Sequence, residues 1–293
     1  RTLDLKWDSI ESIGGGAFQD CGYDFGELDY LPNVKTIGAW AFGNVQTLTS
    51  VSLSSLTRIE REAFIGCGNL ESASVDGAGL RLEGGGENDY YTYGPFARCP
   101  KLRTVRLGDG VVSIPYRLFY GSTNLETVVL GRGITVANTV LRDLKNLTTV
   151  VARGAIRDIP TGMFSGCSNL RTLDLKWDSI ESIGGGAFQD CGYDFGELDY
   201  LPNVKTIGAW AFGNVQTLTS VSLSSLTRIE REAFIGCGNL ESASVDGAGL
   251  RLEGGGENDY YTYGPFARCP KLRTVRLGDG VVSIPYRLFY GST

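Results

Sequence analysis

The seven cysteines of the chain recur at one fixed position, three residues after a phenylalanine. They are Cys21, Cys67, Cys99, Cys167, Cys191, Cys237 and Cys269. Thiols repeated in this way could bind a metal, form disulfides, or fill small spaces in a hydrophobic core. Elsewhere the same position holds Val45, Ser122, Leu144, Val215 and Ser292, which are small or apolar. This pattern favours the third interpretation, a buried cysteine that behaves as a small hydrophobic side chain.

A second group of chemically active side chains combines acidic residues with tyrosines in the stretch DGAGLRLEGGGENDYYTYGPF, residues 76–96. Tyrosines supply large contact area at low entropic cost, and loops on a rigid scaffold often carry function. We therefore expect this stretch and its copy, called here the inserts, to bind a protein or glycan ligand. The candidate partner-binding residues are Glu87, Asp89, Tyr90, Tyr91, Tyr93, Glu257, Asp259, Tyr260, Tyr261 and Tyr263.

Two other interpretations of the insert stay open. The tyrosines could pack against the flank of their own protein, where aromatic rings bury large areas. The acidic residues could form a calcium loop, although their spacing does not match an EF-hand and lacks its closing glutamate.

Composition argues against several classes of function. The chain has no histidine, which removes Ser-His-Asp and Cys-His catalysis and His-ligated zinc. A net charge of -6 argues against nucleic acid as the main partner. The glycine runs lack the context of phosphate-binding loops, and no apolar run approaches the roughly 18 residues that span a bilayer. We therefore expect no catalytic residue, cofactor, metal or membrane-spanning segment.

The cysteines and tyrosines lie on a short repeat that runs along the whole chain and is clearest in IRDIPTGMFSGCSNLRTLDL, residues 156–175. Residues such as Leu102–Leu107 alternate between apolar and polar, which predicts a strand with one buried face. A second extended piece follows, such as Val111–Pro115, and then a segment carrying Ala-Phe, such as Arg61–Cys67. About 22 residues per repeat leave room for only a turn or two of helix in that segment.

The short repeat is nested in a longer one, because residues 171–293 are identical to residues 1–123, an offset of 170. The apolar anchors of one long repeat are Phe18, Phe42, Phe64, Phe96, Phe119, Leu141 and Phe164. Their spacing gives seven coils per long repeat and about twelve in the chain. Since each coil can bury its apolar face only against its neighbours, we predict one continuous solenoid over residues 1–293.

Stacked coils would align equivalent residues about 4.8 Å apart. Neighbouring cysteines such as Cys67 and Cys99 would then fall within the Cα range of a disulfide, although parallel side chains seldom reach its torsion angle. Outward strand positions would form a hydroxyl column of Thr2, Ser50, Ser72, Thr104, Thr127, Thr149 and Thr172. This column either docks a partner or reflects the preference of threonine for strands.

The pattern I-x-x-I-x-x-x-(A/M)-F-x-x-C-x-x-L-x-x-(V/L)-x-L, seen as IESIGGGAFQDC at residues 10–21, resembles the BspA-like leucine-rich repeat family. The resemblance covers essentially the entire chain. It implies a right-handed leucine-rich-repeat solenoid, classed as an α/β solenoid, with a parallel β-sheet on one face. The other face is expected to hold short strands and 3₁₀ or helical turns. It also implies a surface or secreted protein of host-associated bacteria or parasitic protists, linked to adhesion and without shared catalytic residues.

We therefore expect a non-enzymatic scaffold for adhesion or protein–protein interaction, located at the cell surface or in the extracellular space. The alternative is a structural filament or matrix protein assembled from tandem 170-residue units. Arg1 and Thr293 both fall inside a coil, which suggests a fragment or processed product. Uncapped coil ends would also invite self-association end to end.

Overall fold

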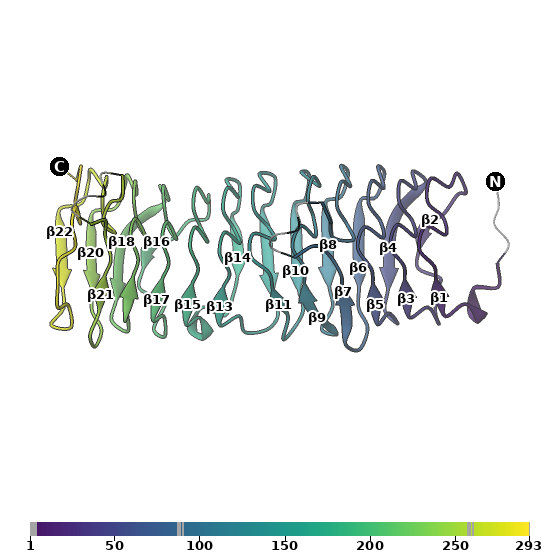
Figure 1. The fold of residues 1–293 in the computed structure, drawn as a ribbon, viewed down its shortest axis with the longest axis horizontal. Coiled ribbons are helices and arrows are strands. Elements are labelled where there is room, and N and C mark those ends of the chain that lie inside the picture. Colours follow the sequence, from purple (N-terminus) through teal and green to yellow (C-terminus); the bar gives the residue numbers. More distant parts are fainter. Residues whose placement is uncertain (1–4, 87–88, 90, 257–258, 260, 293) are drawn as a thin grey trace. The chain divides into compact units, whose positions relative to one another are not determined.

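The computed structural model describes residues 5–86, 89, 91–256, 259 and 261–292. The chain divides into two compact units. The first comprises Arg1–Val140, Leu144–Gly154 and Thr172–Asp174, and the second comprises Leu141–Asp143, Ala155–Arg171 and Leu175–Thr293. Within each unit, successive coils add strands to two parallel sheets (Figure 1). A single continuous solenoid over residues 1–293 stays a prediction.

The first unit contains a seven-stranded and a six-stranded sheet. The seven-stranded sheet consists of β2 (Gly26–Leu28), β4 (Leu48–Leu53), β6 (Ser72–Val75), β8 (Thr104–Leu107), β10 (Thr127–Leu130), β12 (Thr149–Ala152) and β14 (Thr172–Asp174). The six-stranded sheet consists of β1 (Ser12–Ile13), β3 (Thr36–Ile37), β5 (Arg58–Ile59), β7 (Leu80–Leu82), β9 (Val111–Ile114) and β11 (Thr135–Val136).

The second unit repeats this arrangement with a four-stranded and a five-stranded sheet. The four-stranded sheet consists of β16 (Gly196–Leu198), β18 (Leu218–Leu223), β20 (Ser242–Val245) and β22 (Thr274–Leu277). The five-stranded sheet consists of β13 (Asp158–Ile159), β15 (Ser182–Ile183), β17 (Thr206–Ile207), β19 (Arg228–Ile229) and β21 (Arg251–Leu252).

The predicted register of the longer strands is confirmed. Thr104 pairs with Thr127, and Val105 with Val128, so equivalent residues of neighbouring coils face one another. The apolar members of the alternating pattern, such as Val105 and Val128, are buried. Apolar residues thus line the interior, and the hydroxyl column from Ser50 to Thr172 lies on the outer face of the sheet. Thr2, the first member predicted for this column, lies outside the described residues.

The anchor phenylalanines form a stack through the centre of each unit. The rings of Phe42 and Phe64 lie 5.3 Å apart at an interplanar angle of 4°, and Phe64 and Phe96 lie 5.3 Å apart at 6°. All three side chains are fully buried. Leu141, which was predicted to take the same role, is also buried. The anchors therefore supply the continuous core that single coils cannot form alone.

The segments that carry the anchors are turns, so the α/β label and the predicted helical turns are wrong. Within the described residues, the helices are two short 3₁₀ elements, η1 (Trp7–Ser9) and η2 (Trp177–Ser179). Two positions after the anchor the backbone is left-handed, with φ of 55° at Asp20, 57° at Asn44 and 69° at Gly66. An α-helix needs φ near -63° throughout, so this residue stops helix growth within one turn.

The backbone amides of these turns donate to the next coil. Phe18 N donates to the carbonyl of Ala41, and Phe42 N to that of Ala63, each at 2.8 Å. A helix would require the same amides to bond four residues back along their own segment. Coil stacking and helix formation therefore compete for the same backbone amide donors. In this structure the amides bond to the next coil, so no helix forms in these segments.

Candidate partner-binding surface

The cysteine position is a hydrogen-bonding position as well as an apolar one. The Cys67 thiol donates to the carbonyl of Phe42 at 3.1 Å, and the Cys99 thiol to that of Phe64 at 3.2 Å. Ser122 occupies the same position and donates its hydroxyl to the Phe96 carbonyl at 2.8 Å. Each side chain therefore caps the anchor carbonyl of the preceding coil, a role that the sequence pattern did not reveal.

The cysteines are free thiols, and six of the seven are buried. Burial raises the pKa of the Cys67 thiol to about 12 and that of Cys191 to about 11. These thiols are therefore protonated donors at neutral pH and poor nucleophiles. This finding agrees with the buried-core interpretation of the cysteines.

Replacing Cys67 with serine should lower the free energy of unfolding by about 0.5 kcal/mol or less, because a hydroxyl keeps the bond to Phe42. Cys67→Ala should cost about 1 kcal/mol, because it removes the donor and leaves space in the core. Urea unfolding of the two variants measures the difference. A serine variant less stable than the alanine variant would contradict the donor role.

The insert contains a hydrogen-bonded turn around Asp89. The carboxylate oxygen Oδ1 of Asp89 accepts hydrogen bonds from the backbone amides of Tyr91 and Thr92, both at 3.0 Å. The hydrogen bond from the Thr92 side chain is the main cause that lowers the pKa of Asp89, and the charge of Arg117 adds to it. Tyr91, held in this turn, is 89% exposed. The predicted residues Glu87, Tyr90, Glu257 and Tyr260 lie outside the described residues.

A buried carboxylate ties the end of the insert to the preceding coil. Glu62, which is 7% exposed, accepts a hydrogen bond from the Tyr93 amide at 3.2 Å. In the second copy Glu232 accepts from the Tyr263 amide at 3.3 Å and from the Trp210 indole at 2.8 Å. The insert is therefore fastened to its coils at the point where it rejoins them.

Tyr93 belongs to a mixed cluster that we call the tyrosine–arginine platform, consisting of Tyr93, Arg98, Arg117 and Tyr120. The two tyrosine rings stack at 4.9 Å. The Arg98 guanidinium lies 4.7 Å from the centre of the Tyr93 ring, and its Nη2 donates to the Tyr93 hydroxyl at 3.1 Å. Arg117 lies 5.5 Å from the centre of the Tyr120 ring. The copy consists of Tyr263, Arg268, Arg287 and Tyr290, with the same 4.9 Å stack.

The platform separates the predicted residues into two sets. Tyr93 packs against Tyr120 of the next coil, whereas Tyr91 is exposed on the turn that Asp89 holds. Sequence reasoning missed Arg117 and Tyr120 because their contacts with Tyr93 arise only when two coils stack. It also missed Arg98, which contacts Tyr93 within the same coil. The residue type of Arg98 was an available signal, since other coils hold Gly, Asn or Asp at its position.

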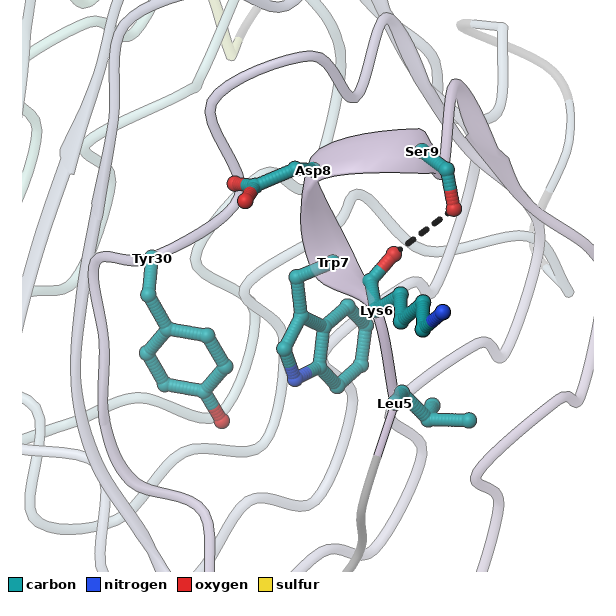
Figure 2. A pocket seen from close by; sticks show the side chains of 6 residues that line it. All are labelled: Leu5, Lys6, Trp7, Asp8, Ser9 and Tyr30. Carbon is teal, nitrogen blue, oxygen red and sulfur yellow. Dashed lines mark hydrogen bonds between the residues drawn. The ribbon is translucent and has the colours of Figure 1, made fainter.

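A pocket of about 480 Å³ lies beside η1 and is lined by residues 5–9 and Tyr30 (Figure 2). The rings of Trp7 and Tyr30 are in edge contact, with their centres 5.5 Å apart. Leu5 lines this pocket and is 37% exposed, whereas its copy Leu175 is 6% exposed. In the second copy the preceding coil stacks on the equivalent coil, as shown by the pairing of β13 with β15. The surface that forms the pocket beside η1 is therefore one on which another coil can stack, rather than a built ligand site. Self-association end to end stays a prediction.

Two further sequence expectations concern metals and membranes. In the part of the chain that the structure describes, His, Cys, Asp and Glu side chains do not gather in threes as a metal site would require. The described helices are all too short to cross a bilayer.

Comparison with known proteins agrees with the repeat pattern. The sequence model of the BspA type leucine rich repeat region matches residues 2–80, 92–195 and 194–293. The leucine-rich repeat-containing G-protein coupled receptor 5 of Rattus norvegicus is 30% identical over 134 residues, which are 44% of this chain and 14% of the receptor. The match therefore spans about one seventh of that receptor's length.

Solved structures with a similar fold include two bacterial proteins. A leucine-rich repeat protein from Bacteroides ovatus shares 23% identity at a TM-score of 0.39, covering 80% of this chain and 76% of that one. A leucine rich cell surface protein from Faecalibacterium prausnitzii shares 18% identity at a TM-score of 0.39, covering 92% of this chain and 83% of that one. Because the sequence model of the family matches most of its length, this chain belongs to the BspA type leucine-rich repeat family.

Proposed function

We propose that this chain is a non-enzymatic scaffold, displayed at the cell surface or outside the cell, that serves adhesion by binding a partner protein through its two inserts. The observation that carries this proposal is the exposure of Tyr91 and Tyr261, each 89% exposed on a hydrogen-bonded turn. A tyrosine held on a fixed backbone loses little conformational entropy when a partner covers it. Most of the phenylalanine side chains of the coils, in contrast, are buried in the core.

The arrangement of the inserts supports the same proposal. Each insert occupies one coil of a regular array and is tied to the preceding coil by Glu62 or Glu232. Rigid scaffolds with variable loops are a common basis for specific recognition. Two identical inserts would also allow bivalent binding, in which the second contact benefits from effective concentration.

The test starts by screening the chain against an array of immobilised extracellular proteins and measuring the affinity of any binder. Tyr91→Ser combined with Tyr261→Ser should raise Kd at least about tenfold, because exposed tyrosines dominate such contacts. Melting should shift by less than about 2 °C, because both rings are in solvent.

The matched control is Val112→Ser combined with Val282→Ser, which removes exposed apolar side chains, 42% and 77% exposed, outside the inserts. Affinity should be unchanged in this control. A binder whose affinity is the same in the tyrosine variant would refute the role of the inserts, and so would an array without any binder.

A further inference from the structure

The tyrosine–arginine platform places a large cation where other coils have small residues. Two positions after the anchor, the first long repeat holds Asp20, Asn44, Gly66, Gly121, Asp143 and Gly166, but Arg98 in the platform coil. Arg98 has a left-handed backbone with φ of 54°, and its copy Arg268 has 55°. Left-handed backbone favours Gly, Asn and Asp, so an arginine here is strained. Because the two long repeats are identical in sequence, the same strained arginine recurs in the second platform.

Of the two rings of the platform, Tyr93 is half-buried, whereas Tyr120 is 50% exposed. Tyr93 is contacted by Tyr120 at 4.9 Å and by the Arg98 guanidinium at 4.7 Å. A sugar would need an open aromatic face against which to lay its C–H groups. The packing of Tyr93 therefore disfavours the stacking of a glycan on that ring.

The accessible chemistry of the platform is cationic. Arg98 is exposed, and within the described ranges no carboxylate forms an ion pair with it. A guanidinium presents a planar set of N–H donors that matches a carboxylate in two parallel hydrogen bonds. Stacking on Tyr93 holds this plane in place before a ligand arrives, which reduces the entropy lost on binding.

The charge around Arg98 limits the size of the anion that fits. The charge of Arg117 makes a small contribution to the lowered pKa of Asp89, so the platform lies near a carboxylate of its own chain. The protein as a whole has a net charge of -6. A long polyanion would be repelled by this surrounding charge, whereas a single carboxylate on a short segment would not.

From these observations we infer that each platform binds a carboxylate on an acidic peptide segment of a partner protein. Arg98, or Arg268 in the second copy, holds the carboxylate, and the exposed Tyr91 or Tyr261 contacts the adjoining part of the peptide. This inference rests on the proposed scaffold function and adds to it the chemical class of the ligand.

The test uses a fluorescein-labelled peptide of alternating leucine and glutamate pairs, titrated with the full chain and followed by fluorescence anisotropy. Arg98→Gly combined with Arg268→Gly should weaken binding at least about tenfold, since the variant lacks the charged fork. Its melting temperature should be unchanged or slightly raised, because glycine is the residue that Gly66 and Gly121 supply at this position. Added salt should weaken binding to the unaltered chain.

Asp143→Gly is the matched control, because it makes the same backbone change in a coil without a platform. It should leave peptide affinity unchanged. A peptide with glutamine in place of glutamate should bind at least about tenfold more weakly. Equal binding by the arginine variant, failure of the unaltered chain to bind the glutamate peptide, or binding of heparin in its place would overturn the inference.

A fall in melting temperature of more than about 5 °C in the arginine variant would also overturn it, because Arg98 would then hold the fold together. A partner protein that still binds the Arg98→Gly, Arg268→Gly chain but is lost on Tyr91→Ser, Tyr261→Ser would refute the carboxylate role alone. The proposed function would survive that result.

Discussion

Replacing Phe64 with alanine should lower the free energy of unfolding of its unit by about 3–5 kcal/mol, the largest loss expected from a single side chain. The Phe64 ring is fully buried and stacks at 5.3 Å on both Phe42 and Phe96. Removal would leave a cavity in the middle of the stack, which the hydrogen-bonded turns on either side cannot close. Urea unfolding measures the effect.

Phe64→Leu provides the matched control, because Leu141 already fills an equivalent position and is buried. We expect it to cost about 1–2 kcal/mol, since leucine fills most of the same volume. An alanine variant that loses less than about 1 kcal/mol would contradict the view that the anchor stack is the core of the unit.

Replacing Gly77 with alanine should lower the free energy of unfolding by more than about 3 kcal/mol, because the backbone around Gly77 leaves no room for a side chain. Gly77 follows β6 with φ of 147°, a conformation that side chains rarely adopt. An added Cβ would lie 1.8 Å from the carbonyl oxygen of Leu56 in the neighbouring coil. Because that oxygen belongs to the backbone, the coils would have to separate to relieve the clash.

Alanine variants at two other glycines distinguish the effect of the steric clash at Gly77 from the effect of its backbone strain. Gly79 is left-handed at φ of 71° but has no atom within 4 Å of an added Cβ, so Gly79→Ala should cost about 1 kcal/mol. Gly14 has neither constraint, and Gly14→Ala should be close to neutral. Equal stabilities of the alanine variants at positions 77 and 14 in thermal melting would contradict this account.

The sequence predicted the parts of the fold that depend on periodicity. Alternation in Leu102–Leu107 correctly indicated β8, and Val111–Pro115 correctly indicated β9. The anchors were identifiable because a large apolar residue recurring every coil has no other place to be buried. These features require only local pattern and the stacking rule.

The features that the sequence did not reveal depend on contacts between coils. The Ala-Phe segments looked compatible with a helical turn, but their amides donate to the next coil. The thiol of Cys67 looked only apolar because its acceptor, the Phe42 carbonyl, belongs to another coil. Tyr93 looked like an exposed contact residue, and only the stacked structure places it against Tyr120.

The exposed part of the insert was predicted more successfully. Tyr91, which was expected to bind a partner, is 89% exposed. Its partner-binding role stays a prediction.

The central claim is that the coils build the scaffold while the inserts recognise the partner. It is tested most directly by replacing residues 83–95 and 253–265 with Glu-Arg-Glu-Ala, the regular sequence found at 60–63. The strands β5 and β7 pair on one side of this segment and Phe64 stacks on Phe96 on the other, so the shortened coil can still close. We predict a folded chain that melts cooperatively and binds its partner at least about tenfold more weakly. A shortened chain that binds the partner with unchanged affinity would contradict the claim.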